Sequence, residues 1–156
     1  MKKLVAGVLA AVACMMMFSA CGKGSTQKEP ATADVAKAVV DQLTFRDELM
    51  VLDDKQVDVI YRLEENKIAE KTCYVSGSRA TAEEVSVFKV KDTADVQMVK
   101  DAIEERIEDQ KIAYENYVPE EMVKINGAVT YQQGNYVILV MADDTSSVED
   151  IFKKQF

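Results

Sequence analysis

The chain has 156 residues, of which 29% are charged, and it carries a formal net charge of −8 with three cysteines and no histidine. Nucleic acids and anionic lipids repel so acidic a chain, which argues against DNA or RNA binding. The lack of histidine excludes His-containing triads, Cys–His nucleophiles and most zinc sites. We therefore expect no cofactor and no metal centre.

Residues 1–20 have the pattern of a secretory signal. Lys2 and Lys3 precede an apolar run from Leu4 to Phe18, and small residues follow in Ser19-Ala20-Cys21-Gly22. A basic head, an apolar segment and small residues at the cut site are typical of a signal peptide. The cysteine directly after the small pair indicates a lipoprotein signal, with lipid attached to Cys21. A membrane-spanning anchor is the alternative, but Leu4–Ala20 is short for a hydrocarbon core of about 30 Å.

The chain after the signal divides into a tether and one domain. Residues 21–31 are polar and rich in small residues, which predicts a flexible tether. Residues 32–156 are enough for a single domain with its own core. Removing residues 1–20 takes away Lys2 and Lys3 but no acid, so the net charge changes from −8 to −10. Cys73 then has no cysteine partner within the domain, and we expect a buried thiol.

The first half of the domain predicts two helices followed by a hairpin. Apolar spacing predicts an amphipathic helix over 32–43 and a short helix or turn after Asp53-Asp54. The segment 44–52 has no clear period and stays unassigned. Residues 68–76 and 84–91 predict two strands joined through the loop 77–82. The second strand carries apolar residues on both faces, which favours an interior position.

The second half predicts a long helix, another hairpin and a final helix. The helix is expected over 94–117, with one stripe made of Val96, Val99, Ile103, Ile107, Gln110, Tyr114 and Tyr117. Alternation from Val123 to Tyr131 predicts a half-buried strand, and Gly134-Asn135 suits a tight turn before the apolar strand 136–142. Asn126-Gly127 is a weaker alternative for the turn. Ser146 and Glu149 predict a capping box for the last helix.

This order of elements predicts an α+β domain. Its expected core is an antiparallel sheet of about four strands, formed by two hairpins and packed by a long central helix and terminal helices.

The chain resembles a family of uncharacterised lipoproteins from Gram-positive clostridial bacteria, the domain of unknown function numbered 4358. The matching features are the signal ending at Cys21, Ala82-Glu83-Glu84-Val85-Ser86-Val87-Phe88-Lys89, Tyr117-Val118-Pro119-Glu120 and Gly134-Asn135-Tyr136-Val137. The resemblance spans most of residues 32–156. It implies an anchored extracytoplasmic domain and carries over no catalytic residues.

Tyrosines and one arginine are the candidate binding residues. Tyr114, Tyr117, Tyr131 and Tyr136 could gather near the end of the long helix and line a pocket, since the amphipathic tyrosine ring suits interfaces. Core packing is the default for Tyr114 and Tyr117, because both lie on the apolar stripe. Arg79 in the hairpin loop could bind an anion.

Carboxylates are the candidates for chemistry. Asp143 or Asp144 together with Glu84 could act as general acid and base in a glycan hydrolase, if the two groups face each other across an open cleft. Solvation of a strand end is the simpler interpretation of Asp143-Asp144, and the glycine of a calcium loop is missing after them. No catalytic residue is assigned.

The leading functional expectation is a non-enzymatic binding or adaptor module. It would be held on the extracytoplasmic face of the cell membrane by lipid on Cys21 and would bind an envelope protein or peptide. The alternatives are the carboxylate-dependent envelope hydrolase and a structural lipoprotein with no specific ligand.

Overall fold

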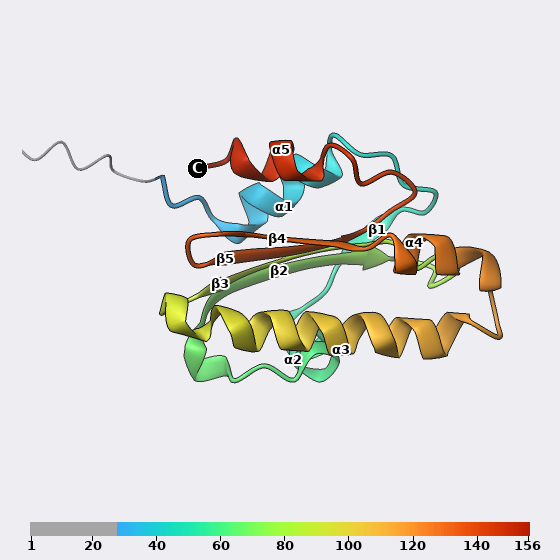
Figure 1. Cartoon of the computed structure of the whole chain (residues 1–156), viewed down its shortest axis with the longest axis horizontal. Helices are drawn as coiled ribbons and strands as arrows, with labels where there is room; N and C mark the ends of the chain where they lie inside the picture. The colour runs from blue at the N-terminus through green and yellow to red at the C-terminus, as the bar shows by residue number, and fades with distance from the viewer. Residues whose placement is uncertain (1–27) are drawn as a thin grey trace, which may run out of the picture.

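The computed structural model describes residues 28–156 (Figure 1). The expected signal peptide, the lipid site Cys21 and most of the expected tether lie outside these residues. Pro30 and Thr32 are buried, and the Tyr136 hydroxyl donates to the Pro30 carbonyl oxygen over 2.8 Å. The packed part of the chain therefore includes Pro30, which the sequence analysis assigned to the tether. No helix within residues 28–156 is long and apolar enough to cross a membrane.

A five-stranded antiparallel sheet forms the centre of the fold. Its order is β1-β2-β3-β5-β4, so β3 occupies the middle. The strands are β1 (Leu49–Val51), β2 (Ile68–Ser76), β3 (Glu84–Val90), β4 (Val129–Gln133) and β5 (Tyr136–Met141). The structure confirms the α+β class and both predicted hairpins, and adds β1 at one edge. A three-residue strand is too short to show a period, which is why the segment before Asp53 could not be assigned.

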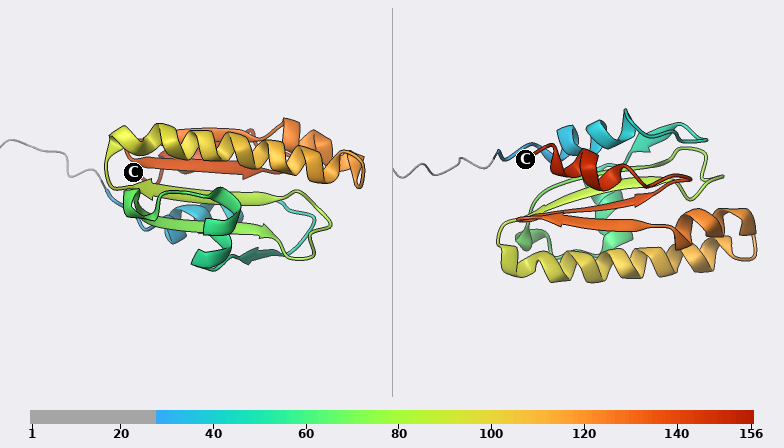
Figure 2. Two further views of the ribbon diagram at one scale, coloured as in Figure 1. Left: turned by 90° about the horizontal axis from the view of Figure 1, so that it is seen from below. Right: turned by 45° about the horizontal axis from the view of Figure 1, so that its top comes forward.

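Helices cover both faces of the sheet (Figures 1 and 2). On one face, α1 (Thr32–Val40) and α5 (Val148–Lys153) pack on the alternate residues of β3 and β5 that include Val85 and Ile138. On the other face, α2 (Asp54–Tyr61) and α3 (Val96–Tyr114) pack on the intervening residues, including Phe88 and Leu139. Because successive side chains of a strand point to opposite faces, two separate apolar cores result. This arrangement confirms the predicted interior position of β3.

Four helix details follow from local contacts. The predicted short helix is confirmed as α2, where Asp53 and Gln56 form a capping box. The long helix α3 ends at Tyr114 and leaves Tyr117 in the turn that follows. The predicted capping box at Ser146 is wrong, because Ser147 holds the N-cap position of α5 without a side-chain bond. The Ser146 backbone N–H instead donates to Asp144.

The predicted strand beginning at Val123 is also wrong. Residues Met122–Asn126 form the short helix α4, and the strand starts only at Val129. Val123 is 74% exposed whereas Lys124 is 1% exposed, which reverses the inside–outside assignment that alternation suggested. Pro119 begins the preceding 3-10 turn, and Lys124 forms an i,i+3 ion pair with Glu121. Lys124 is buried because it pairs with acids. Hydrophobic patterning in the sequence does not reveal a lysine that is buried for this reason.

Candidate functional site

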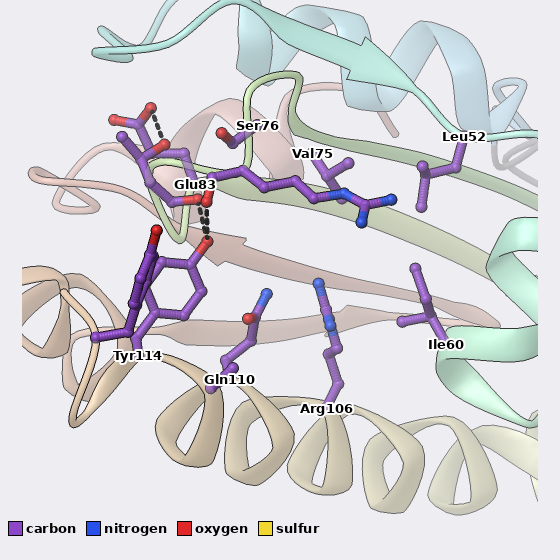
Figure 3. A pocket seen from close by; sticks show the side chains of 12 residues that line it. Leu52, Ile60, Val75, Ser76, Glu83, Arg106, Gln110 and Tyr114 are labelled. Carbon is purple, nitrogen blue, oxygen red and sulfur yellow. Dashed lines mark hydrogen bonds between the residues drawn. The ribbon is translucent and has the colours of Figure 1, made fainter.

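A cleft of about 430 Å³ opens between the helical layer of α2 and α3 and the end of the sheet near the loop 77–83 (Figure 3). This volume lies in the usual range for small-molecule and peptide-side-chain pockets, about 300–1,000 Å³. The side chains of Arg106 and Gln110 project from α3 into the cleft, opposite Val75 and Ser76 of β2. Its lining residues are Leu52, Ile60, Val75, Ser76, Arg79, Thr81, Glu83, Arg106, Gln110, Ala113, Tyr114 and Tyr117.

Gln110 is the most informative residue of the cleft. The residue is 8% exposed, and its amide forms no hydrogen bond with any group of residues 28–156. No buried side-chain atom in that range is both unpaired and sealed from solvent, so the amide still reaches the cleft. A polar group buried without a partner costs free energy that a water molecule or a ligand can recover. The cleft therefore holds a donor and an acceptor that are free to bind.

Arg106 is positioned by a buried carboxylate. Its Nε and Nη2 atoms donate to Oε2 of Glu84 over 3.0 and 2.9 Å, and Glu84 is fully buried. The other oxygen of Glu84 accepts from the hydroxyls of Tyr61 and Ser86. Burial opposes the charge on Arg106, but Glu84 outweighs it and raises the pKa of the guanidinium above its usual value. A guanidinium has five N–H donors, and Nη1 of Arg106 has no hydrogen-bond partner among residues 28–156.

Arg79 brings a second guanidinium to the same cleft. It forms no ion pair with any group of the described residues, 28–156. Its backbone is left-handed, with φ 59°, a conformation uncommon outside glycine and asparagine. The Tyr114 hydroxyl lies 3.1 Å from the carbonyl oxygen of Arg79 and 2.7 Å from that of Thr81, and it can donate to either. Tyr114 thereby fixes the loop that carries Arg79.

A buried cluster of charges supports the wall behind this loop. Lys124 of α4 donates to Glu83 over 3.1 Å and lies 2.9 Å from Glu121, and all three side chains are at most 3% exposed. Glu83 also accepts from the backbone N–H groups of Arg46 and Asp47. Burial acts to raise the pKa of Glu83, but these hydrogen bonds and Lys124 lower it below its usual value. The Glu83 carboxylate thus stays charged and is enclosed by hydrogen-bond donors.

The structure brings together three of the five predicted binding residues. Arg79, Tyr114 and Tyr117 line the cleft, and Tyr117 is 83% exposed at its rim. Tyr131 and Tyr136 lie on the opposite face of the sheet, against the core under α1 and α5. The expected cluster of four tyrosines is therefore wrong, because Tyr131 and Tyr136 point to the face away from α3. Sequence reasoning did not identify Gln110 and Arg106 as site residues. The position of Gln110, a polar residue within the predicted apolar stripe, could have indicated a role for it.

The carboxylates considered for hydrolysis do not face one another across an open cleft. Glu84 is fully enclosed by its contacts with Arg106, Tyr61 and Ser86. Asp143 is instead surface-exposed and pairs with Arg46 over 2.8 Å. Because both carboxylates of a hydrolytic pair must reach a bound substrate, Glu84 and Asp143 cannot act together as general acid and base. Within residues 28–156, no group of three or more His, Cys, Asp or Glu side chains is placed to hold a metal ion.

Cys73, in contrast, agrees with the expectation of a core thiol. It is fully buried in the core under α2 and α3. Burial, together with the charge of Glu84, raises the pKa of its thiol far above the usual value. A thiol of this kind stays protonated and unreactive at neutral pH.

The fold and cleft define the class of the molecule as an α+β domain with one face carrying a partly apolar, arginine-lined cleft. Residues 41–142 match the family described as Domain of unknown function (DUF4358), and the chain belongs to that family. The matched segment includes every residue that lines the cleft. No curated protein matches the chain, and no solved structure matches it either.

Proposed function

We propose that this protein is a membrane-anchored extracytoplasmic lipoprotein whose domain acts as a non-enzymatic binding or adaptor module at the cell envelope. The anchor in this proposal is lipid on Cys21, supported by the signal pattern of residues 1–22. The partner is an envelope protein or peptide, and it binds in the cleft beside α3. One observation carries the choice of site: Gln110 is 8% exposed, and its amide reaches a ligand-sized cleft beside two arginines without a hydrogen-bond partner among residues 28–156.

The composition of the cleft favours recognition over catalysis. Leu52, Ile60 and Val75 supply an apolar wall, and the polar groups are few and converge from α3 and from the loop after β2. Such a combination is common in binding sites, where the apolar wall gives affinity and the polar groups give orientation. The carboxylates close to the cleft, Glu83 and Glu84, are both saturated by donors within the protein. Neither is free to serve as a base.

Site-specific photo-crosslinking in cells tests the proposal. A benzophenone amino acid replaces Tyr117, whose ring stands exposed at the rim of the cleft. The matched control carries the same group at Lys154, an exposed position after α5 on the opposite side of the sheet. We expect a discrete partner to be recovered from position 117 and not from position 154. The yield should fall in the Cys21→Ala chain, because the lipid no longer places the domain at the membrane.

A different result would overturn the proposal. Recovery of the same abundant surface proteins from positions 117 and 154 would mean that the cleft selects no partner. Equal recovery of a partner with and without Cys21 would remove the anchored part of the proposal while leaving the binding part in place.

A further inference from the structure

We propose that the cleft recognises an acylated amino acid end, that is, a free carboxylate next to an amide bond and an apolar side chain, as at the C-terminus of a peptide. This inference rests on the proposed binding function and assigns the chemistry of the ligand at the same site. Three independent features of the cleft support it: an arginine, Arg79, that has no ion-pair partner among residues 28–156, the amide of Gln110 that has no hydrogen-bond partner there, and the apolar wall.

The two arginines of the cleft favour an anion. The protein as a whole is acidic, with a net charge of −8, yet Arg79 at this site has no acidic partner among residues 28–156. The carboxylate of Glu83 is enclosed by two backbone N–H groups and by Lys124, which it shares with Glu121. Glu84 likewise uses the Nε and Nη2 atoms of Arg106. An anion entering the cleft therefore meets the guanidinium of Arg79, which has no ion-pair partner among residues 28–156, and Nη1 of Arg106, which has no hydrogen-bond partner there.

The geometry of the donors favours a carboxylate. A planar guanidinium binds a planar carboxylate through parallel N–H···O bonds, which add orientation to the charge attraction. Arg106 is held rigidly, since Glu84 fixes one edge of its guanidinium and α3 carries its backbone. Its remaining edge is thus directed before any ligand arrives. Preorganisation of this kind lowers the entropy cost of binding.

Gln110 selects the group beside the carboxylate. A glutamine amide has one carbonyl acceptor and two N–H donors, which match the N–H and C=O groups of a peptide bond. Gln110 lies one turn of α3 from Arg106, so both side chains project into the cleft from the same face of the helix (Figure 3). A ligand whose carboxylate binds Arg106 therefore has its own neighbouring amide close to Gln110. The apolar residues Leu52, Ile60 and Val75 line the rest of the cleft and suit an aliphatic side chain.

Binding measurements on the full chain in detergent micelles test the inference. The probes are N-acetyl-Ala-Leu with a free carboxylate, the same dipeptide with a C-terminal amide, and inorganic phosphate. We expect the carboxylate form to bind at least about ten-fold more tightly than the amide, since a charge-assisted hydrogen bond in a partly buried site is worth that factor or more. Phosphate should compete poorly, because it offers no amide and no apolar group.

Two variants connect the binding to the named residues. Arg79→Gln should weaken the carboxylate form about ten-fold and leave the amide form nearly unchanged. Gln110→Leu should weaken both forms, because the matching amide is lost in each case. Lys154→Gln is the control, since it removes one positive charge on the far side of the sheet and should leave both affinities unchanged. Circular dichroism checks that each variant is folded.

The source of the ligand is distinguished by length. A twelve-residue peptide ending in Ala-Leu that binds as well as the dipeptide indicates a protein C-terminus, whereas exclusion of the longer peptide indicates a free small acyl amino acid. Equal binding of carboxylate and amide forms, equal competition by phosphate, or no binding by any probe would each overturn the inference. In those cases a partner crosslinked from position 117 would still support the binding module, so the two proposals can fail separately.

Discussion

Replacing Gln110 by leucine should make the protein more stable. Gln110 is 8% exposed as a residue, and its amide has no hydrogen-bond partner within residues 28–156. An unsatisfied buried polar group costs about 1–3 kcal/mol, and the low end applies here because the amide atoms still reach the solvent of the cleft. Leucine has a similar volume and helix propensity and would extend the apolar wall. We expect the free energy of unfolding to rise by about 1 kcal/mol, which corresponds to a melting temperature about 3–6 °C higher.

Urea unfolding followed by circular dichroism measures this change. Gln97→Leu is the matched control, because it makes the same substitution on α3 at an exposed position and should change stability by less than about 0.5 kcal/mol. A destabilised Gln110→Leu chain would refute the reasoning, since it would mean that the amide is already satisfied in the free protein. Stabilisation together with weaker ligand binding is the expected trade-off at a site that is kept polar for function.

Three further predictions concern groups around the cleft and in the core. Lys124→Met should cost about 3–5 kcal/mol at neutral pH, because it removes the lysine that pairs with the buried carboxylates of Glu83 and Glu121. Urea unfolding at neutral pH measures this, and the exposed Lys153→Met should change stability little. Hydrogen bonds from Ser76 and Ser78 lower the pKa of Asp47 to about 2 from 3.8. The stability that Asp47 contributes is therefore present above about pH 4 and is lost as the pH falls toward 2, and Asp47→Asn should flatten the measured stability profile in that window. Buried Cys73 should resist a thiol reagent at neutral pH until the protein unfolds in urea, and rapid labelling of the native chain would contradict its placement.

Periodicity in the sequence was sufficient to predict the elements that have one clear apolar face. The strand 68–76 and the turn at Gly134 agree with the structure, and the long helix differs mainly at its ends. Periodicity failed where tertiary contacts decide the local structure. β1 has only three residues and exists by pairing with β2, and α4 places a lysine in the interior because acids from other segments meet it there.

The candidate site was only partly visible in the sequence for the same reason. Arg79, Tyr114 and Tyr117 could be named as candidates from their residue types, but their assembly depends on the loop 77–83 folding back against α3. The wrong inclusion of Tyr131 and Tyr136 came from treating tyrosines near one end of the fold as neighbours. The two lie on strands whose register turns both rings toward α1 and α5, and that register is set by pairing across the sheet.

Two consecutive glutamates explain how the cleft obtains rigid polar walls. Glu83 precedes β3 and Glu84 begins it, so their side chains diverge and meet different cations, Lys124 and Arg106. Burying each carboxylate is costly unless its hydrogen bonds are complete, and such complete networks hold their members in one geometry. Lys124 thereby anchors the loop that ends at Glu83, and Glu84 orients Arg106 within the opposite helix. Since both walls are fixed before a ligand arrives, the cleft can bind a small charged group without first ordering flexible side chains.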